Sequence, residues 1–324
     1  MRLDLRRGMQ AILLLGFAII ATACHEEKLK QPITNFQKNT ETAATAISSY
    51  YTELNHLERD LYFQDQLLNP HWQVLFKDSI GKPTPLLSDP FDPNSIQARI
   101  ALIRQIAAYA EKLSVLAGHE GPGRLQTNAA ELTTSFVKLG GRFNELGNSS
   151  DSADQDAKDY AGPISAIVGI IGQVIIEEER EKALKPAIRK GEKPITEILS
   201  FLERDLKKYV ESTRRTGHKQ KLAQLVSAYN NNAARDTLPL EQRKKMLDQI
   251  RQAAEEVRII SVSQPADVIR GMKGVHQELV KAAHAPTSTN LGAVMSALEE
   301  YDDKVEDLVE AAIKLRELRK GETP

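Results

Sequence analysis

The last part of the chain carries the pattern that constrains the fold most. Between residues 291 and 315, apolar side chains recur at alternating spacings of three and four residues, without a break. The positions are Leu291, Val294, Leu298, Tyr301, Val305, Leu308, Ala312 and Leu315. Only an α-helix brings residues with this period onto one face, and such a run is typical of a coiled-coil seam. A long helix that packs against another helix is therefore predicted here.

A similar stripe lies near the other end of the chain. It consists of Ile47, Tyr50, Leu54, Leu57, Leu61 and Leu68, and Pro70 ends it. Because the first and last helices share this spacing, we expect them to lie side by side and to bring the ends of the domain together.

Further segments with helical spacing lie between these two helices. They are residues 96–117, 125–146, 161–176, 195–229, 246–260 and 269–283, and Asn94 with Gln97 is typical of a capping box before the first of them. Aromatic residues make up only 5% of the chain, which suits closely packed helices. The prediction is an all-α, antiparallel bundle of about seven to eight helices, with long coiled-coil-like first and last helices.

Two features bear on how the bundle is divided. Glycine and proline at residues 191–194 predict a break near the middle of the chain, so the bundle of residues 35–320 could consist of two halves that meet there. Residues 161–176 form the most apolar run after residue 24. The run is too short for a membrane span, and its glycines favour a fully buried central helix with close neighbours.

The first residues are typical of a secretory signal. Arg2, Arg6 and Arg7 precede an apolar run over residues 11–20, which is shorter than a transmembrane helix. Export across a membrane is therefore expected.

The residues that follow, Ala21-Thr22-Ala23-Cys24, resemble the lipobox of bacterial lipoproteins. The resemblance covers only this segment and implies a signal peptide over residues 1–23, acyl chains such as palmitate on Cys24, and a membrane-held protein. Ala21 stands where leucine is usual, which leaves ordinary cleavage after Ala23 open. His25, rather than aspartate, follows the cysteine, a pattern that favours the outer membrane over the inner one. Residues 24–34 are polar and predict a short tether.

Composition and motifs exclude several classes of function. Cys24 is the only cysteine, so neither an internal disulfide nor a cysteine-based zinc cluster is expected. The net charge of −1 gives no general attraction to nucleic acid. No phosphate-binding loop, dinucleotide fingerprint, nucleophile elbow or zinc-protease motif occurs in the sequence, so no catalytic residue, cofactor or metal site is predicted.

Two histidines were weighed as metal ligands. Glu53 and His56 have the spacing found in carboxylate-bridged metal sites of helical bundles, but no second pair occurs, which favours a solvated polar face. His276 lies beside apolar residues and is predicted to be a hydrogen-bonded histidine at the edge of the core.

Two regions could contact a partner. Seven cations lie between Arg204 and Lys221, and they indicate either a solvated helix face or a patch for lipid headgroups or an acidic partner. Arg214, Arg215 and Lys219 are the candidate contacts within it. Trp72 lies in a proline-rich segment that could be a recognition loop or a cap over one end of the bundle.

The sequence therefore predicts a non-enzymatic envelope lipoprotein that faces the periplasm and acts as a helical scaffold or protein-binding module. Its expected partners are the membrane, through Cys24, and another envelope protein. The alternative is a small-ligand or metal-binding sensor or carrier in the periplasm, with a hydrophobic ligand held near residues 162–172.

Overall fold

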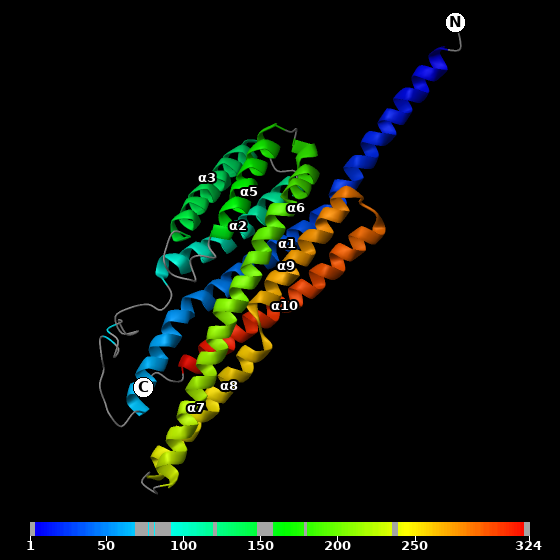
Figure 1. Ribbon diagram of the computed structural model, residues 1–324. Coiled ribbons are helices and arrows are strands. Elements are labelled where there is room, and N and C mark those ends of the chain that lie inside the picture. Colours follow the sequence, from blue (N-terminus) through cyan, green and yellow to red (C-terminus); the bar gives the residue numbers. More distant parts are fainter. Residues whose placement is uncertain are drawn as a thin grey trace.

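The computed structural model describes residues 4–68, 92–118, 122–147, 158–177, 180–234 and 239–320, together with Lys77 and Gly81. Side chains are not described for residues 4–27, 122–131, 171–182 and a few helix ends. The described parts form a bundle of helices (Figure 1), which confirms the all-α prediction.

Nine α-helices and one π-helical turn, η1, make up the described chain. Their bounds are α1 (Asp4–Leu68), α2 (Pro93–Gly118), α3 (Pro122–Leu146), α5 (Lys158–Glu177), α6 (Arg180–Asp205), η1 (Leu206–Glu211), α7 (Ser212–Ala234), α8 (Leu240–Val262), α9 (Pro265–His284) and α10 (Ser288–Lys320). Since η1 joins α6 to α7 without a gap, these three elements form one continuous rod.

The first and last long helices lie side by side, as predicted. The rings of Phe36 and Tyr301 are 6.3 Å apart between centroids, and the Tyr301 hydroxyl lies 3.5 Å from Thr40 Oγ1. Residues 38–49 of α1 face residues 302–316 of α10 in the same chain direction.

The prediction that the ends of the domain meet is therefore wrong. The start of α1 and the end of α10 lie at opposite ends of the molecule (Figure 1). Heptad spacing determines which face of a helix is buried, but it contains no information on whether the partner runs parallel or antiparallel.

The predicted break at residues 191–194 is also wrong, because α6 runs through it. Gly191 is required by a close approach between helices, since a Cβ atom there would lie 2.6 Å from the Tyr109 hydroxyl of α2. Pro194 costs the helix one backbone hydrogen bond. It is buried beside Ile195, Ile198 and Leu199, whose packing offsets that cost.

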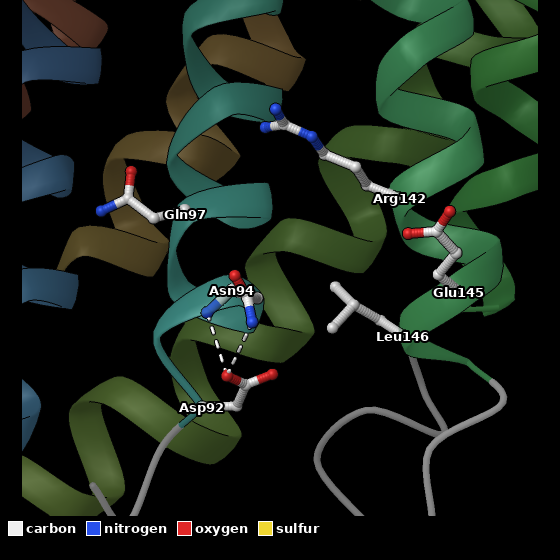
Figure 2. A pocket seen from close by; sticks show the side chains of 6 residues that line it. All are labelled: Asp92, Asn94, Gln97, Arg142, Glu145 and Leu146. Carbon is white, nitrogen blue, oxygen red and sulfur yellow. Dashed lines mark hydrogen bonds between the residues drawn. The ribbon is translucent and has the colours of Figure 1, made fainter.

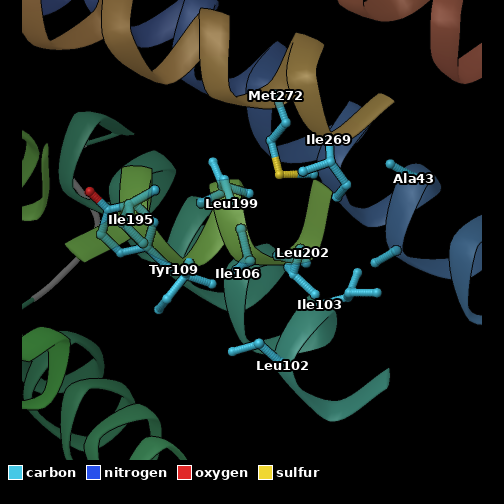
Figure 3. Packing of buried hydrophobic residues seen from close by; sticks show 14 of the residues in the cluster. Ala43, Leu102, Ile103, Ile106, Tyr109, Ile195, Leu199, Leu202, Ile269 and Met272 are labelled. Atoms are coloured by element: carbon cyan, nitrogen blue, oxygen red, sulfur yellow. The ribbon is translucent and has the colours of Figure 1, made fainter. Parts of the chain in front are cut away.

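One main core joins the helices on both sides of residue 191. Figure 3 shows Ile103, Ile106 and Tyr109 of α2 meeting Leu199 and Leu202 of α6 and Ile269 and Met272 of α9. A second, smaller cluster lies between α8 and α10 and consists of Ile259, Ile260, Ala311 and Leu315. Residues 35–320 therefore form one bundle in the described chain, and not two halves.

The tether predicted over residues 24–34 differs from the structure. This segment is part of α1, and Leu29 and Ile33 are fully buried in the main core. Residues 29–33 contain few apolar side chains, so the stripe was not recognised there. Among the described side chains, burial in the core is already present at Leu29, five residues after Cys24.

The prediction of a buried central helix over residues 161–176 is wrong for the side chains that are described. Tyr160, Ile164 and Ile167 of α5 are buried, whereas Gly162, Ser165 and Gly169 are exposed. A Cβ atom at Gly162 or Gly169 would meet no neighbour within 4 Å, so these glycines do not serve close helix packing. Among the described residues, no helix combines the length and apolar character needed to span a bilayer.

Candidate functional site

Buried charges gather around the π-helical turn at residues 206–211. A π-helix has one more residue per hydrogen-bonded turn than an α-helix, and such turns occur often at functional sites. We define the charge belt as the buried residues Arg99, Asp205, Glu211, Arg214, His218 and Glu256, each at most 8% exposed. They come from α2, from the rod formed by α6, η1 and α7, and from α8.

Asp205 joins three helices through one of its carboxylate oxygens. Its Oδ2 atom accepts hydrogen bonds from Arg99 Nε at 2.9 Å and from the Tyr51 hydroxyl at 2.7 Å. Arg99 also donates to the side chain and the backbone oxygen of Ser95, one turn earlier on α2. Three helices, α1, α2 and α6, are thereby held at one carboxylate.

The pKa values follow from this arrangement. Burial acts to lower the pKa of Arg99, but the Asp205 carboxylate outweighs it, so the pKa lies above its ordinary value. Burial also raises the pKa of Tyr51 well above its usual range, and the charge of Asp205 adds to this effect. Tyr51 is therefore a neutral hydrogen-bond donor, and Arg99 is charged.

Glu211 and Arg214 connect the rod to α9 and α1. Glu211 Oε1 accepts a hydrogen bond of 2.9 Å from the backbone N–H of Ala266, in the first turn of α9. Arg214 donates to Glu53 Oε2 at 3.1 Å, and its guanidinium carbon lies 3.9 Å from the centre of the Tyr50 ring. Burial raises the pKa of Glu211, although the hydrogen bond from Ala266 acts against this.

The last part of the belt joins α7 to α8. His218 Nδ1 lies 2.9 Å from Glu256 Oε2, and Lys221 Nζ lies 3.4 Å from the same oxygen. Burial acts to raise the pKa of Glu256, but the hydrogen bond with His218 and the charge of Lys221 outweigh it and lower the pKa.

The belt is suited to holding helices together. Each of its carboxylates is paired with a cation or a backbone N–H, as buried charges require. No group of three or more potential metal ligands occurs among the described residues. The contacts of the belt among the described residues are ion pairs and hydrogen bonds between helices.

The structure separates the predicted partner contacts. Arg214 is 2% exposed and directed at Glu53, so its prediction as a partner contact is wrong: it neutralises a carboxylate inside the bundle. Arg215 and Lys219 are exposed on the next turns of α7. Trp72 lies outside the described residues. Cys24 lies in α1, whose backbone is described there, but the side chain of Cys24 is not among the described ones.

The exposed cations of the rod between residues 204 and 219 form one surface. We call it the cationic face, and it consists of Arg204, Lys207, Lys208, Arg215 and Lys219. Two carboxylates partly neutralise its positive charge: Arg204 pairs with Asp159, and Lys207 pairs with Glu203. Arg270 and Lys273 of α9 also contact Glu203, so cations outnumber acids around the groove that Arg204, Lys207 and Lys208 line.

The residues weighed as metal ligands are not arranged as a site. Glu53 is half-buried and paired with Arg214, whereas His56 is exposed, so only His56 fits the predicted solvated face. His276 is completely buried, and not at the core edge as predicted. Its Nε2 atom lies 3.3 Å from the Tyr109 hydroxyl, and burial lowers the pKa of His276 to about 4.

A pocket lies between the start of α2 and the end of α3 (Figure 2). It measures about 720 Å³ and is lined by Asp92, Asn94, Gln97, Arg142, Glu145 and Leu146. Asp92 Oδ1 accepts hydrogen bonds from the backbone and side chain of Asn94. Asp92, followed by Pro93, therefore caps α2 in place of the predicted Asn94–Gln97 box. Arg142 and Glu145 are exposed, and the pocket has no buried charged group that would hold a ligand.

Comparisons with protein-family models, with curated proteins and with solved structures found no match for this chain.

The charge belt gives a prediction for stability. Replacing Asp205 by leucine leaves Arg99 charged and buried, which should lower the free energy of unfolding by about 3–5 kcal/mol in a denaturant titration. Replacing both residues by leucine should recover much of this loss, because no unpaired charge remains. As a control, Glu255→Gln removes an exposed pair with Arg258 and should leave the unfolding midpoint nearly unchanged. Equal losses in the single and double variants would contradict the prediction.

His276 gives a prediction for pH dependence. The unfolded chain binds a proton at this side chain near pH 6.5, but the folded chain binds it only near pH 4. Between these values the unfolded state holds more protons, so stability falls as the pH is lowered from 6.5 to 4, by roughly 3 kcal/mol. His276→Gln should flatten this part of the stability curve, measured by denaturant unfolding at each pH. His284→Gln, at an exposed site on the same helix, should retain the wild-type slope; a wild-type slope in His276→Gln would refute the assignment.

Proposed function

We propose that this protein is an envelope lipoprotein whose helical bundle acts as a non-enzymatic scaffold, held at a membrane by lipid on Cys24 and facing the periplasm. The observation that carries the proposal is the signal-like segment that ends at Cys24, followed within five residues by Leu29, the first buried residue among the side chains that the structure describes. A chain acylated at Cys24 would thus pass directly from its anchor into its packed core. Because His25, and not aspartate, follows Cys24, the outer membrane is the proposed location.

The position of the cationic face favours a protein partner over lipid headgroups. The rod that carries this face packs beside residues 51–64 of α1, through Tyr51 and Gln64. Along a helix that rises 1.5 Å per residue, these positions lie roughly 40–60 Å from Cys24. If Cys24 sits at the membrane surface and α1 points away from it, the cationic face is out of reach of that surface. An acidic protein surface in the envelope is the proposed partner.

The alternative of a small-ligand carrier has no specific observation in its favour. The segment proposed to hold a ligand, residues 162–172, exposes Gly162 and Gly169 on the outside of α5.

The anchor is tested by intact mass and membrane fractionation of the full chain expressed in a Gram-negative host. The wild type should begin at Cys24, carry added acyl mass and sediment with membranes, because several acyl chains give stable membrane residence. Cys24→Ala should lack the added mass and lose membrane attachment. A wild type that begins at Cys24 without added mass and stays soluble would remove the basis of the proposal.

The partner is tested by chemical crosslinking in intact cells. The double variant Arg215→Glu/Lys219→Glu should lose crosslinked envelope partners that the wild type retains, because charge reversal opposes an acidic surface. Arg189→Glu/Lys190→Glu is the matched control, since both residues are exposed cations of α6 outside the cationic face. If the two double variants crosslink alike, the cationic face is not the contact.

A further inference from the structure

The hairpin of α7 and α8 projects from one end of the bundle (Figure 1). A hydrogen bond of 3.3 Å from Gln224 of α7 to Asp65 of α1 holds the hairpin near its base. We call the part beyond it, residues 225–234 and 240–251, the arm. Large apolar side chains are exposed on it: Leu240 is 78% exposed and Leu247 is 48% exposed. Two helices alone cannot bury all of their apolar surface, so the arm is left with a face that lacks cover.

The exposed side of α8 has a regular pattern of its own. Residues spaced by three or four positions run along it: Leu240, Lys244, Leu247, Arg251, Ala254, Arg258 and Val262. We call this row the outer stripe. The opposite side of α8 carries the buried residues Ala253, Glu256 and Ile260. Apolar and cationic residues thus alternate on a helix face that nothing in the described chain covers, as in a basic amphipathic helix that docks into a groove.

A groove of suitable shape lies between α1 and α10. Because these helices run parallel, their outer surfaces leave two adjoining hollows of about 320 and 380 Å³ that share Thr42, Val309 and Ile313. Small and apolar residues form most of its surface, among them Thr45, Ala46 and Ala312. Along α10 the groove extends from Asp302 to Arg316, a length of about 21 Å, which is enough for about four turns of a docked helix.

The charges along the groove are opposite to those of the outer stripe. Asp302, Glu306 and Glu310 line it on the α10 side. They belong to a strongly acidic stretch of α10 that consists of Glu299, Glu300, Asp302, Asp303, Glu306, Asp307 and Glu310, with Lys304 and Lys314 as its cations. Lys38 and Arg316 lie along the groove as well and mark its two ends. An occupant with cations at its centre is therefore favoured.

We propose that the outer stripe of α8 in one copy of this chain docks into the α1–α10 groove of a second copy. Leu240 and Leu247 would enter the groove, and Lys244 and Arg251 would pair with the acids along α10. The existing pair between Arg251 and Asp248 is an exposed one within a helix, so exchanging it costs little. Stripe and groove lie on different surfaces, so each copy can donate one contact and accept another, which yields a closed ring or a chain of copies. This self-association does not depend on lipid at Cys24.

The test uses two differently tagged full-length chains, both with Cys24→Ala, expressed in the same cells. This background has no other cysteine. One chain carries Leu247→Cys and the other carries Ile313→Cys, and a short bifunctional thiol reagent is added. A crosslinked species with both tags is expected. In the control, Val137→Cys, a 55% exposed site on α3, replaces Leu247→Cys and should give only background crosslinking.

Charge reversal then separates docking from chance collision. Arg251→Glu in the donor or Glu306→Lys in the acceptor should each lower the crosslink yield several-fold, and the two together should restore it, because the opposite charges are matched again. A yield no higher than the Val137→Cys control would overturn the proposal. So would a yield that single reversals leave unchanged, or one that the double reversal fails to restore. Because all chains lack Cys24, the result is independent of the outcome of the anchor experiment.

Discussion

The fold depends on one buried carboxylate. A charge removed from water costs several kcal/mol unless it is met by opposite charge and hydrogen bonds. Asp205 obtains both at Oδ2, where Arg99 of α2 and Tyr51 of α1 reach the same oxygen, whereas its buried Oδ1 accepts no hydrogen bond from the described residues. Apolar packing alone tolerates small shifts of one helix along another. The hydrogen bonds to the shared carboxylate do not tolerate such shifts. They therefore determine the position of each of the three helices along its own axis. The pair is therefore better understood as a source of specificity than of net stability.

The π-helical turn directly after Asp205 determines which charges face inward. An added residue rotates everything that follows relative to an uninterrupted α-helix. After the turn, Glu211 reaches the start of α9, Arg214 reaches α1, and His218 reaches α8. The same rotation leaves Arg215 and Lys219 exposed. One cationic stretch of the sequence thus serves two purposes, internal neutralisation and an external charged surface.

Sequence reasoning predicted the helix faces well and their continuity and direction poorly. The stripe from Leu291 to Leu315 corresponds to one helix, and its partner was identified correctly, because burial follows local periodicity. Gly191 and Pro194 misled, since their effect depends on a Tyr109 side chain more than 80 positions away in sequence. The charge belt was missed although a signal existed. Arg99 lies three residues after Ile96, and Asp205 lies three residues after Leu202. Each charge therefore falls on the apolar face of its helix, where a charged side chain is expected to be buried and paired.

The contact between α1 and α10 has a consequence for the order in which the molecule can form. α1 packs against α2, which is made early, but Phe36 of α1 also meets Tyr301 of α10, so this side of α1 obtains its neighbour only when almost the whole chain has been made. Until then, Phe36 lacks the aromatic ring that packs against it in the folded chain. Contacts between residues far apart in sequence form late and slowly. A polypeptide of this design can close its core only after its last long helix, α10, has been made.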